Sequence, residues 1–223
     1  MKKSTLIKTD VSKLSQFERF NIIRSFRIPK EPFHYLIEKL KNLTIEIGER
    51  PEDSIMDLMY LGLLEGWCWQ TTESAIVFLK DDDFIERGNL KLEPHKDYWH
   101  SWISFNFDGE NYVFDPCLRI LIEKNLFFHL FEVTVYGTAT AKEVRDDLIY
   151  RINHPKSKSY DEKSNEFLKK FFETFSSERQ KTETYVSGGE DVNSPMYRNN
   201  TGYNAVIKNG KIESLIAHYY FNG

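Results

Sequence analysis

The stretch HSWISFNFDGENYVFDP, residues 100–116, constrains the fold of this chain more than any other. Two runs of strand-forming residues, 101–107 and 110–115, are separated by Asp108 and Gly109. Asp-Gly between such runs is a strong signal for a two-residue β-hairpin turn. The sequence therefore predicts two adjacent antiparallel strands here.

The predicted turn also fixes which residues face one another. Counted outward from the turn, His100 falls opposite Cys117, and Trp102 falls opposite Asp115. Side chains alternate between the two faces of a sheet, so His100 and Asp115 are expected to be diagonal neighbours on one face. A bulge in the hairpin would break this arrangement.

A second stretch, GWCWQTTES at residues 66–74, places Cys68 between two tryptophans. The residues after it, with Ala75, Ile76 and Leu79 at helical spacing, predict a helix that begins at or just after Cys68. Residues 51–66 are expected to form a short helix leading into it. Backbone N–H groups at a helix start stabilise a thiolate and lower the pKa of a cysteine there.

These features form a pattern for nucleophilic catalysis. A cysteine nucleophile needs a base that holds it as thiolate and a third group that orients the base. Cys68, His100 and Asp115 occur in that order. Asp115 would fix the tautomer of His100 and stabilise its imidazolium. The sequence thus predicts a Cys-His-Asp catalytic triad.

The combination resembles the transglutaminase-like superfamily of papain-related cysteine enzymes over residues 54–118. In that superfamily a cysteine lies at a helix N-terminus, a histidine at a strand start, and an aspartate on the next strand, closely followed by proline. The resemblance implies that Cys68 is the nucleophile, His100 the base and Asp115 the orienting acid. It also implies an α+β fold with a papain/transglutaminase-like core. The arylamine N-acetyltransferases, a related branch, share a similar GWC sequence at the start of this helix, and the rest of their pattern is not found here.

Other interpretations of the same residues remain open at this stage. Buried cysteines usually serve packing, so Cys68 could belong to the core of a structural protein. A zinc site from Cys68, His100, Asp115 and Cys117 has suitable ligand types but lacks short ligand spacings. The four tryptophans of the chain either pack in the core or line a cleft, where one indole N–H would donate to an oxyanion: Trp67, Trp69, Trp99 and Trp102.

The composition limits the possible partners. A net charge of −4, with no separate block of basic residues, argues against nucleic acid as a partner. No run of roughly 18 apolar residues occurs, so we expect no membrane association. Two cysteines without a CxxC pattern fit a reducing compartment and a cytoplasmic location. No cofactor is indicated.

The 223 residues suit a single domain, because 40% of them are hydrophobic and 15% are aromatic. We expect helices within 1–50, a catalytic core at 54–135, and further helix over 140–175. A polar mobile segment is expected at 176–202, and a hairpin at 203–223 that adds strands to the main sheet. The predicted fold class is α+β, with helices packed on an antiparallel sheet.

The predicted activity is acyl transfer through a thioester, with a peptide, a protein or a small amide or ester as substrate. Water as acceptor would make the protein a peptidase or amidase, which we favour. An amine as acceptor would make it a transglutaminase or N-acetyltransferase-like enzyme. The alternative from another class is a non-catalytic module that keeps the cleft to bind a peptide or protein. The sequence does not indicate an oligomeric state.

Overall fold

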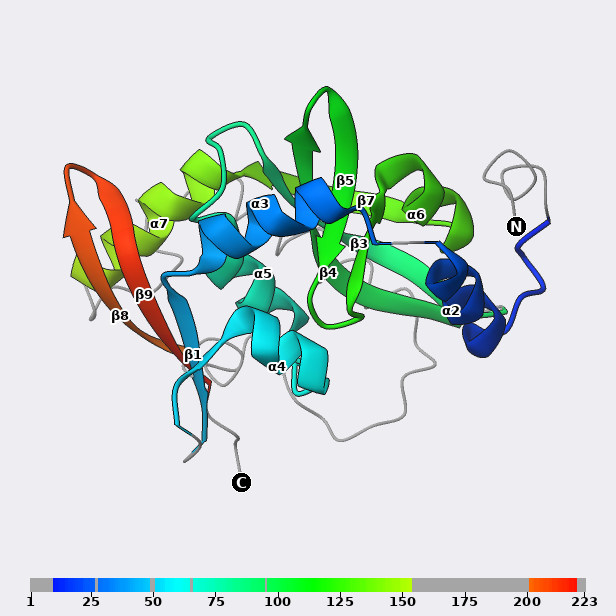
Figure 1. The fold of residues 1–223 in the computed structure, drawn as a ribbon, viewed down its shortest axis with the longest axis horizontal. Helices are drawn as coiled ribbons and strands as arrows, with labels where there is room; N and C mark the ends of the chain where they lie inside the picture. Colours follow the sequence, from blue (N-terminus) through cyan, green and yellow to red (C-terminus); the bar gives the residue numbers. More distant parts are fainter. Residues whose placement is uncertain are drawn as a thin grey trace.

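The computed structural model describes residues 10–26, 28–48, 51–64, 66–94, 96–153 and 201–219. The described part is a mixed fold with two sheets in which antiparallel pairs predominate. Its helices are α2 (Gln16–Ser25), α3 (Lys30–Leu40), α4 (Ile55–Leu61), α5 (Cys68–Ile76), α6 (Lys124–Leu130) and α7 (Ala141–Asn153). The α+β class expected from the sequence is therefore confirmed (Figure 1).

The larger sheet has five strands in the order β6-β5-β4-β3-β7, and all of its pairs are antiparallel. Its strands are β3 (Phe84–Glu93), β4 (Lys96–Phe107), β5 (Glu110–Asp115), β6 (Ile120–Glu123) and β7 (Thr134–Thr140). The smaller sheet has the order β2-β1-β9-β8, and within it β1 and β9 run parallel. Its strands are β1 (Leu43–Ile47), β2 (Asp53–Ser54), β8 (Thr201–Lys208) and β9 (Lys211–Tyr219).

The hairpin of β4 and β5 turns where the sequence predicts it. Asp108 and Gly109 have φ angles of 52° and 82°, the left-handed conformation that a type I′ turn requires at both positions. The strands pair from Phe107 and Glu110 onward in the predicted register. The ladder ends, however, at the pair of residues 103 and 114.

Beyond that point β5 no longer pairs with β4, whereas β4 continues beside β3. The two expected pairs nearest the candidate site, Trp102 with Asp115 and His100 with Cys117, are consequently not part of the ladder.

Helix α5 lies between the two sheets (Figure 1). It is buried from Thr71 to Ile76. One apolar core surrounds it and draws on the small sheet, α3, α4, α7 and one face of the large sheet, with members that include Leu36, Ile45, Ile76, Ile103, Leu148 and Leu215. The helix that begins at Cys68 is thus held from several sides.

The other face of the large sheet is covered by α2 and α6 (Figure 1). A second core fills this layer, and its members include Leu90, Trp102, Val113, Phe127 and Phe131. Trp102 is completely buried there and packs against the ring of Phe127, with centroids 5.6 Å apart.

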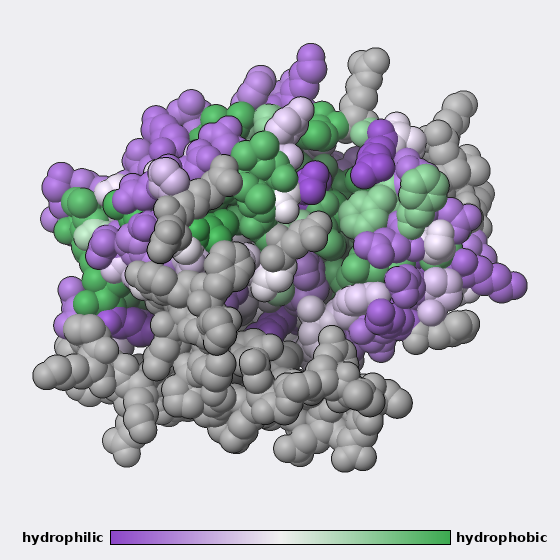
Figure 2. Space-filling view, turned by 90° about the horizontal axis from the view of Figure 1, so that it is seen from below, coloured by the Kyte–Doolittle hydropathy of each residue, from purple (hydrophilic) through white to green (hydrophobic). Residues whose placement is uncertain are grey.

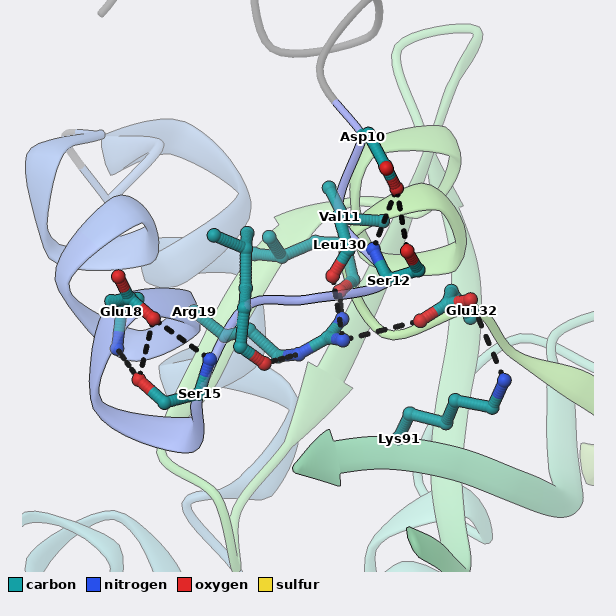
Figure 3. A network of polar contacts seen from close by, with 10 residues as sticks. Asp10, Val11, Ser12, Ser15, Glu18, Arg19, Lys91, Leu130 and Glu132 are labelled. Atoms are coloured by element: carbon teal, nitrogen blue, oxygen red, sulfur yellow. Dashed lines mark hydrogen bonds and ion pairs between the residues drawn. The ribbon is translucent and has the colours of Figure 1, made fainter. Parts of the chain in front are cut away.

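Arg19 of α2 fixes the N-terminal segment to this layer (Figure 3). Its side chain is fully buried and donates to the carbonyl oxygens of Val11 at 2.8 Å, of Leu14 at 3.1 Å and of Leu130. It also pairs with Glu132 at 3.1 Å. A buried guanidinium is tolerated because each of its three nitrogens donates to an acceptor, and the network therefore has a structural role.

The C-terminal hairpin turns on Asn209 and Gly210 as predicted, but it does not join the main sheet. It joins β1 instead, because residues 43–47 pair in parallel with residues 215–219. The prediction that it extends the main sheet is wrong. The segment 43–47 is itself short and alternating, and its role as a partner strand is not evident from its local pattern.

The other expected helices are found with different bounds. Two helices, α2 and α3, occupy the N-terminal region as predicted. α4 begins at Ile55 rather than at Pro51, and Ser54 caps it by accepting from Asp57 N–H. Of the helix expected over 140–175, α7 accounts for residues 141–153. The rest of it, and nearly all of the segment 176–202, lie outside the described residues.

Hydrophilic and hydrophobic residues alternate in small patches on the face seen from below (Figure 2). Among the described residues, no helix has the length and apolar character needed to cross a membrane.

Candidate active site

Cys68 is the first residue of α5, as predicted. Trp67 occupies the capping position but makes no side-chain capping bond. Two threonine hydroxyls within the first turns bond back to the helix, Thr71 to the carbonyl of Trp67 at 2.7 Å and Thr72 to that of Cys68 at 2.6 Å. The first N–H groups of α5 have no acceptor within the helix, and Cys68 lies at this end of it.

His100 and Asp115 meet although their strands have separated. His100 Nε2 lies 2.6 Å from Asp115 Oδ2. The side chain of His100 is 11% exposed and that of Asp115 is fully buried. The second carboxylate oxygen, Oδ1, accepts from the backbone N–H of Cys117 at 3.1 Å and of Leu118 at 3.0 Å. The turn after β5 therefore holds Asp115 in one orientation toward the imidazole.

The imidazole of His100 also acts on the thiol of Cys68, through its charge and as a hydrogen-bonding partner, and these effects lower the pKa of the thiol. Because Nε2 is bound to Asp115, Nδ1 is the ring nitrogen that remains for the sulfur. The structure thus brings the three predicted residues into one chain, from Cys68 through His100 to Asp115.

The charges of this chain support an ion pair. Burial alone raises the pKa of the Cys68 thiol, but the charge of His100, its hydrogen bond and the charge of Arg87 outweigh burial, so that the pKa is lowered. Burial alone lowers the pKa of His100, but the negative charges of Asp115 and Cys68 raise it to about 10. A thiolate beside an imidazolium is therefore the favoured state of the pair.

Cys117 is placed differently from Cys68. It is 5% exposed, and its sulfur lies 3.2 Å from the Thr71 hydroxyl. Burial, together with the nearby charges of Asp115 and Cys68, raises its pKa far above the usual range. Cys117 is a core thiol, and only Cys68 is suited to nucleophilic attack.

The four tryptophans do not share one role. The indole N–H of Trp102 donates to Glu86 Oε2 at 2.8 Å on the side of the sheet that faces α6, so Trp102 cannot serve an oxyanion at Cys68. Lys124 and Ser104 bind the same Glu86 carboxylate, which satisfies this buried acid. Of the two roles considered for the tryptophans, Trp102 therefore has the core role, and it is not a candidate for lining the cleft.

The other three tryptophans are half-buried and lie in aromatic or cationic contacts. Trp67 stacks on Tyr219, with centroids 5.0 Å apart, and Trp99 packs against Tyr136 at 5.1 Å. The guanidinium carbon of Arg87 lies 5.5 Å from the centre of the Trp69 ring. Trp67 and Trp69 flank Cys68 in sequence and are the cleft candidates that remain beside it.

The sequence analysis missed the residues that anchor α5. Glu73, in the middle of this helix, is buried and accepts from Arg151 of α7 at 2.6 Å and from Tyr203 of β8 at 2.5 Å. At the far end, Arg145 donates to the carbonyl oxygens of Val77 at 2.8 Å and Leu79 at 2.9 Å. Glu73 is the one charged residue of α5, CWQTTESAI, and this was the signal that could have identified it.

The acidic run at 81–83 is only partly exposed to solvent. Asp83 is 2% exposed and accepts from the backbone N–H of Asn106 and of Lys80, which ties the end of the α5 segment to β4. Asp81 pairs with Arg145 at 2.6 Å.

Within the described residues, no group of three or more histidines, cysteines or acids is placed to hold a metal ion. The four zinc ligands considered above do not form such a group.

Comparison with models of protein families, with curated proteins and with solved structures gave no match. The geometry of the site is therefore the only guide to the function of this protein.

Proposed function

We propose that the protein is a cysteine-dependent acyl-transfer enzyme of the transglutaminase-like type. The observation that carries this proposal is an arrangement of three residues: Cys68 at a helix start, His100 whose charge acts on its thiol, and a buried Asp115 that binds His100 and whose other oxygen is held by two backbone N–H groups. A structural cysteine has no need of an oriented, charged imidazole beside it.

Cys68 and His100 have the following roles in the proposed reaction. The Cys68 thiolate attacks the carbonyl carbon of an amide or ester and forms a tetrahedral oxyanion. Imidazolium His100 gives its proton to the leaving amine or alcohol, whose bond to carbon breaks, and a thioester with Cys68 remains. His100 then takes a proton from water or an amine as that molecule attacks the thioester, and the thiolate leaves beside the restored imidazolium.

The oxyanion has a source of donors in the backbone. The N–H groups of the first residues of α5 have no acceptor within the helix, and Trp67 does not cap them. Such donors at a helix start stabilise developing negative charge. Asp115 acts as a positioning residue, because it touches only His100 and the backbone of its own turn.

We favour water as the acceptor, which makes the enzyme a peptidase or amidase. No feature of the described residues marks a second site for an amine or a coenzyme beside Cys68.

The proposal is tested with p-nitrophenyl acetate, an activated ester that needs no specific binding. Native protein at pH 7 should release a burst of p-nitrophenolate and carry an acetyl group on Cys68, located by peptide mass spectrometry. Cys68→Ser and His100→Ala should lose the burst, whereas Cys117→Ser should keep it. An acetyl group on another residue, or equal acetylation of Cys68 in His100→Ala, would show that no triad operates.

A further inference from the structure

A cation lies beside the nucleophile on a strand that the sequence analysis did not identify. Arg87 of β3 lies over the ring of Trp69, the residue that follows Cys68, and it is half-buried. Its charge acts on the sulfur, as the lowered pKa of Cys68 reflects. Arg87 precedes Gly88, which pairs with His100 across the sheet.

The register of β3 and β4 places polar residues around this arginine. Arg87 lies opposite Ser101, and two positions along, Asn89 lies opposite Trp99. Because side chains alternate, these four share a face with Ile85 and Ile103, which pack in the core around α5. The face of the sheet that supports α5 thus continues as a polar and aromatic surface.

Two oxygens on this surface have unused hydrogen-bonding capacity. In the part of the chain that the structure describes, Ser101 Oγ and Asn89 Oδ1 are buried without a hydrogen-bond partner. Ser101 is 0% exposed and Asn89 is 8% exposed. Such a group costs about 1–3 kcal/mol when unpaired, so an orphaned buried oxygen calls for an explanation. Two of them beside one arginine indicate a place where a polar ligand completes the bonding.

Aromatic rings enclose this surface on two sides. Trp69 lies against Arg87, and the rings of Trp99 and Tyr136 meet across β3 with centroids 5.1 Å apart. All three rings are half-buried, so they form the accessible walls above the buried Ser101 and Asn89. Rings of this kind exclude water and strengthen an ionic contact between them.

We propose that Arg87, with Asn89 and Ser101, forms a subsite for a carboxylate on the acyl donor, which rests on the function proposed above. A guanidinium binds a carboxylate through two parallel hydrogen bonds. Ser101 can donate to the same group, whereas the Asn89 oxygen accepts an N–H of the ligand. An acceptor oxygen beside the guanidinium suits a ligand that carries both a carboxylate and an amide N–H. The substrate class is thus an acidic peptide or acyl amino acid.

The first test compares two alkylating reagents of nearly equal size, neutral iodoacetamide and anionic iodoacetate. The ratio of their rates with Cys68 at pH 7, iodoacetate over iodoacetamide, should be higher in the native protein than in an unfolded control. Arg87→Gln should lower this ratio roughly tenfold, because the ionic attraction in a half-buried site is lost. Arg87→Lys should keep most of it, and the exposed Lys142→Gln, a matched loss of one positive charge, should not change it.

The outcomes separate the two proposals. If Arg87→Gln slows both reagents by the same factor, Arg87 supports only the thiolate, and the carboxylate subsite is refuted. If neither reagent modifies native Cys68 faster than a free thiol, the proposed catalytic function fails. The carboxylate subsite is then tested only by the binding measurement that follows.

Binding is measured in Cys68→Ser, which needs no reactive sulfur. The probes are N-acetyl-glutamate α-amide, with one side-chain carboxylate, and N-acetyl-glutamine α-amide, its uncharged isostere. The carboxylate probe should raise the Tm and change the tryptophan fluorescence saturably, and Arg87→Gln should abolish both effects while Lys142→Gln retains them. Equal responses to the two probes, or a response that survives Arg87→Gln, would overturn the subsite.

Discussion

Tyr219 of β9 stacks on Trp67, the residue immediately before Cys68, with ring centroids 5.0 Å apart and ring planes inclined by 21°. Tyr219 is fully buried, and its hydroxyl lies 3.1 Å from that of Ser74 in α5. The C-terminal hairpin therefore contacts the nucleophile's helix at its start and about two turns further along. The position of Cys68 therefore depends on packing against residues about 150 positions away in the chain.

Substitution of Tyr219 should separate packing from hydrogen bonding. Tyr219→Ala removes a buried aromatic ring and should lower the free energy of unfolding by about 3–5 kcal/mol. Tyr219→Phe keeps the stacking and should cost only about 1 kcal/mol. Urea denaturation measures both. Alkylation of Cys68 should slow in the alanine variant and stay near wild type in the phenylalanine variant. Equal costs for the two variants would mean that the stacking contributes nothing.

Asp115→Asn should preserve the fold but lower acyl transfer by roughly 10²–10⁴-fold. The amide oxygen can still accept from the N–H groups of Cys117 and Leu118, but this orientation turns the NH₂ toward His100 Nε2. The imidazole then loses its acceptor and its anionic partner, so the pKa of His100 should fall. NMR titration of His100 and a burst assay with p-nitrophenyl acetate measure these effects. An unchanged rate would remove the orienting role.

The pH dependence of alkylation should reveal the ion pair. Since the pKa of Cys68 is lowered, its thiolate persists to a lower pH than that of a free cysteine, and iodoacetamide at pH 6 should label Cys68 well before Cys117. In His100→Ala the main opposing charge is gone and burial dominates, so the rate profile should move to higher pH. Peptide mass spectrometry locates the label.

The rate of acyl transfer should report on the other member of this ion pair, the imidazolium of His100, through its decline at high pH. The pKa of His100 is raised to about 10, so the imidazolium needed to protonate the leaving group persists through neutral pH. Turnover should decline as the pH rises through about 10, because the imidazolium of His100 is lost there while the thiolate of Cys68 remains. A decline centred near pH 6.5, the ordinary histidine pKa, would contradict the proposed pairing with Asp115.

Glu73→Gln should destabilise the protein by about 3–5 kcal/mol, because it leaves the guanidinium of Arg151 with a weaker partner in a buried network. Tyr203 would also lose a charged acceptor. The control is Lys142→Ala in the exposed pair with Asp146, which should cost far less because solvent screens this pair. Thermal and urea denaturation measure the difference. Similar losses for both variants would show that the Glu73 network is not a main anchor of α5.

The sequence predicts the elements whose signals are local. The Asp108-Gly109 turn dictates a register by its own backbone chemistry, and the start of α5 follows from apolar spacing after Cys68. These two features place His100 near Asp115 and put Cys68 at a helix start, whereas the contacts that hold α5 against the sheet are tertiary. The end of the β4–β5 ladder before His100 has no local signal in the sequence.

Strand β3 escapes prediction because its polar residues break the alternation expected of a half-buried strand. Glu86 is buried but satisfied by Trp102, Ser104 and Lys124, partners that only the folded sheet supplies. Arg87, on the opposite face, is held by an aromatic ring from another element. The small sheet is not predicted for a related reason. Its parallel pair, β1 with β9, joins strands far apart in sequence, and neither segment carries a local signal for that pairing.

The parallel pairing of β1 with β9 determines when the site can form during synthesis. Residues 43–47 leave the ribosome long before residues 215–219, and until those later residues emerge, β1 lacks its neighbour and Trp67 lacks the ring of Tyr219. Cys68, His100 and Asp115 are all made earlier, yet the helix that carries the thiol remains incompletely packed. A nascent chain stalled before residue 215 should therefore hold a weakly activated cysteine, so the reactive thiolate matures only after β9 has emerged.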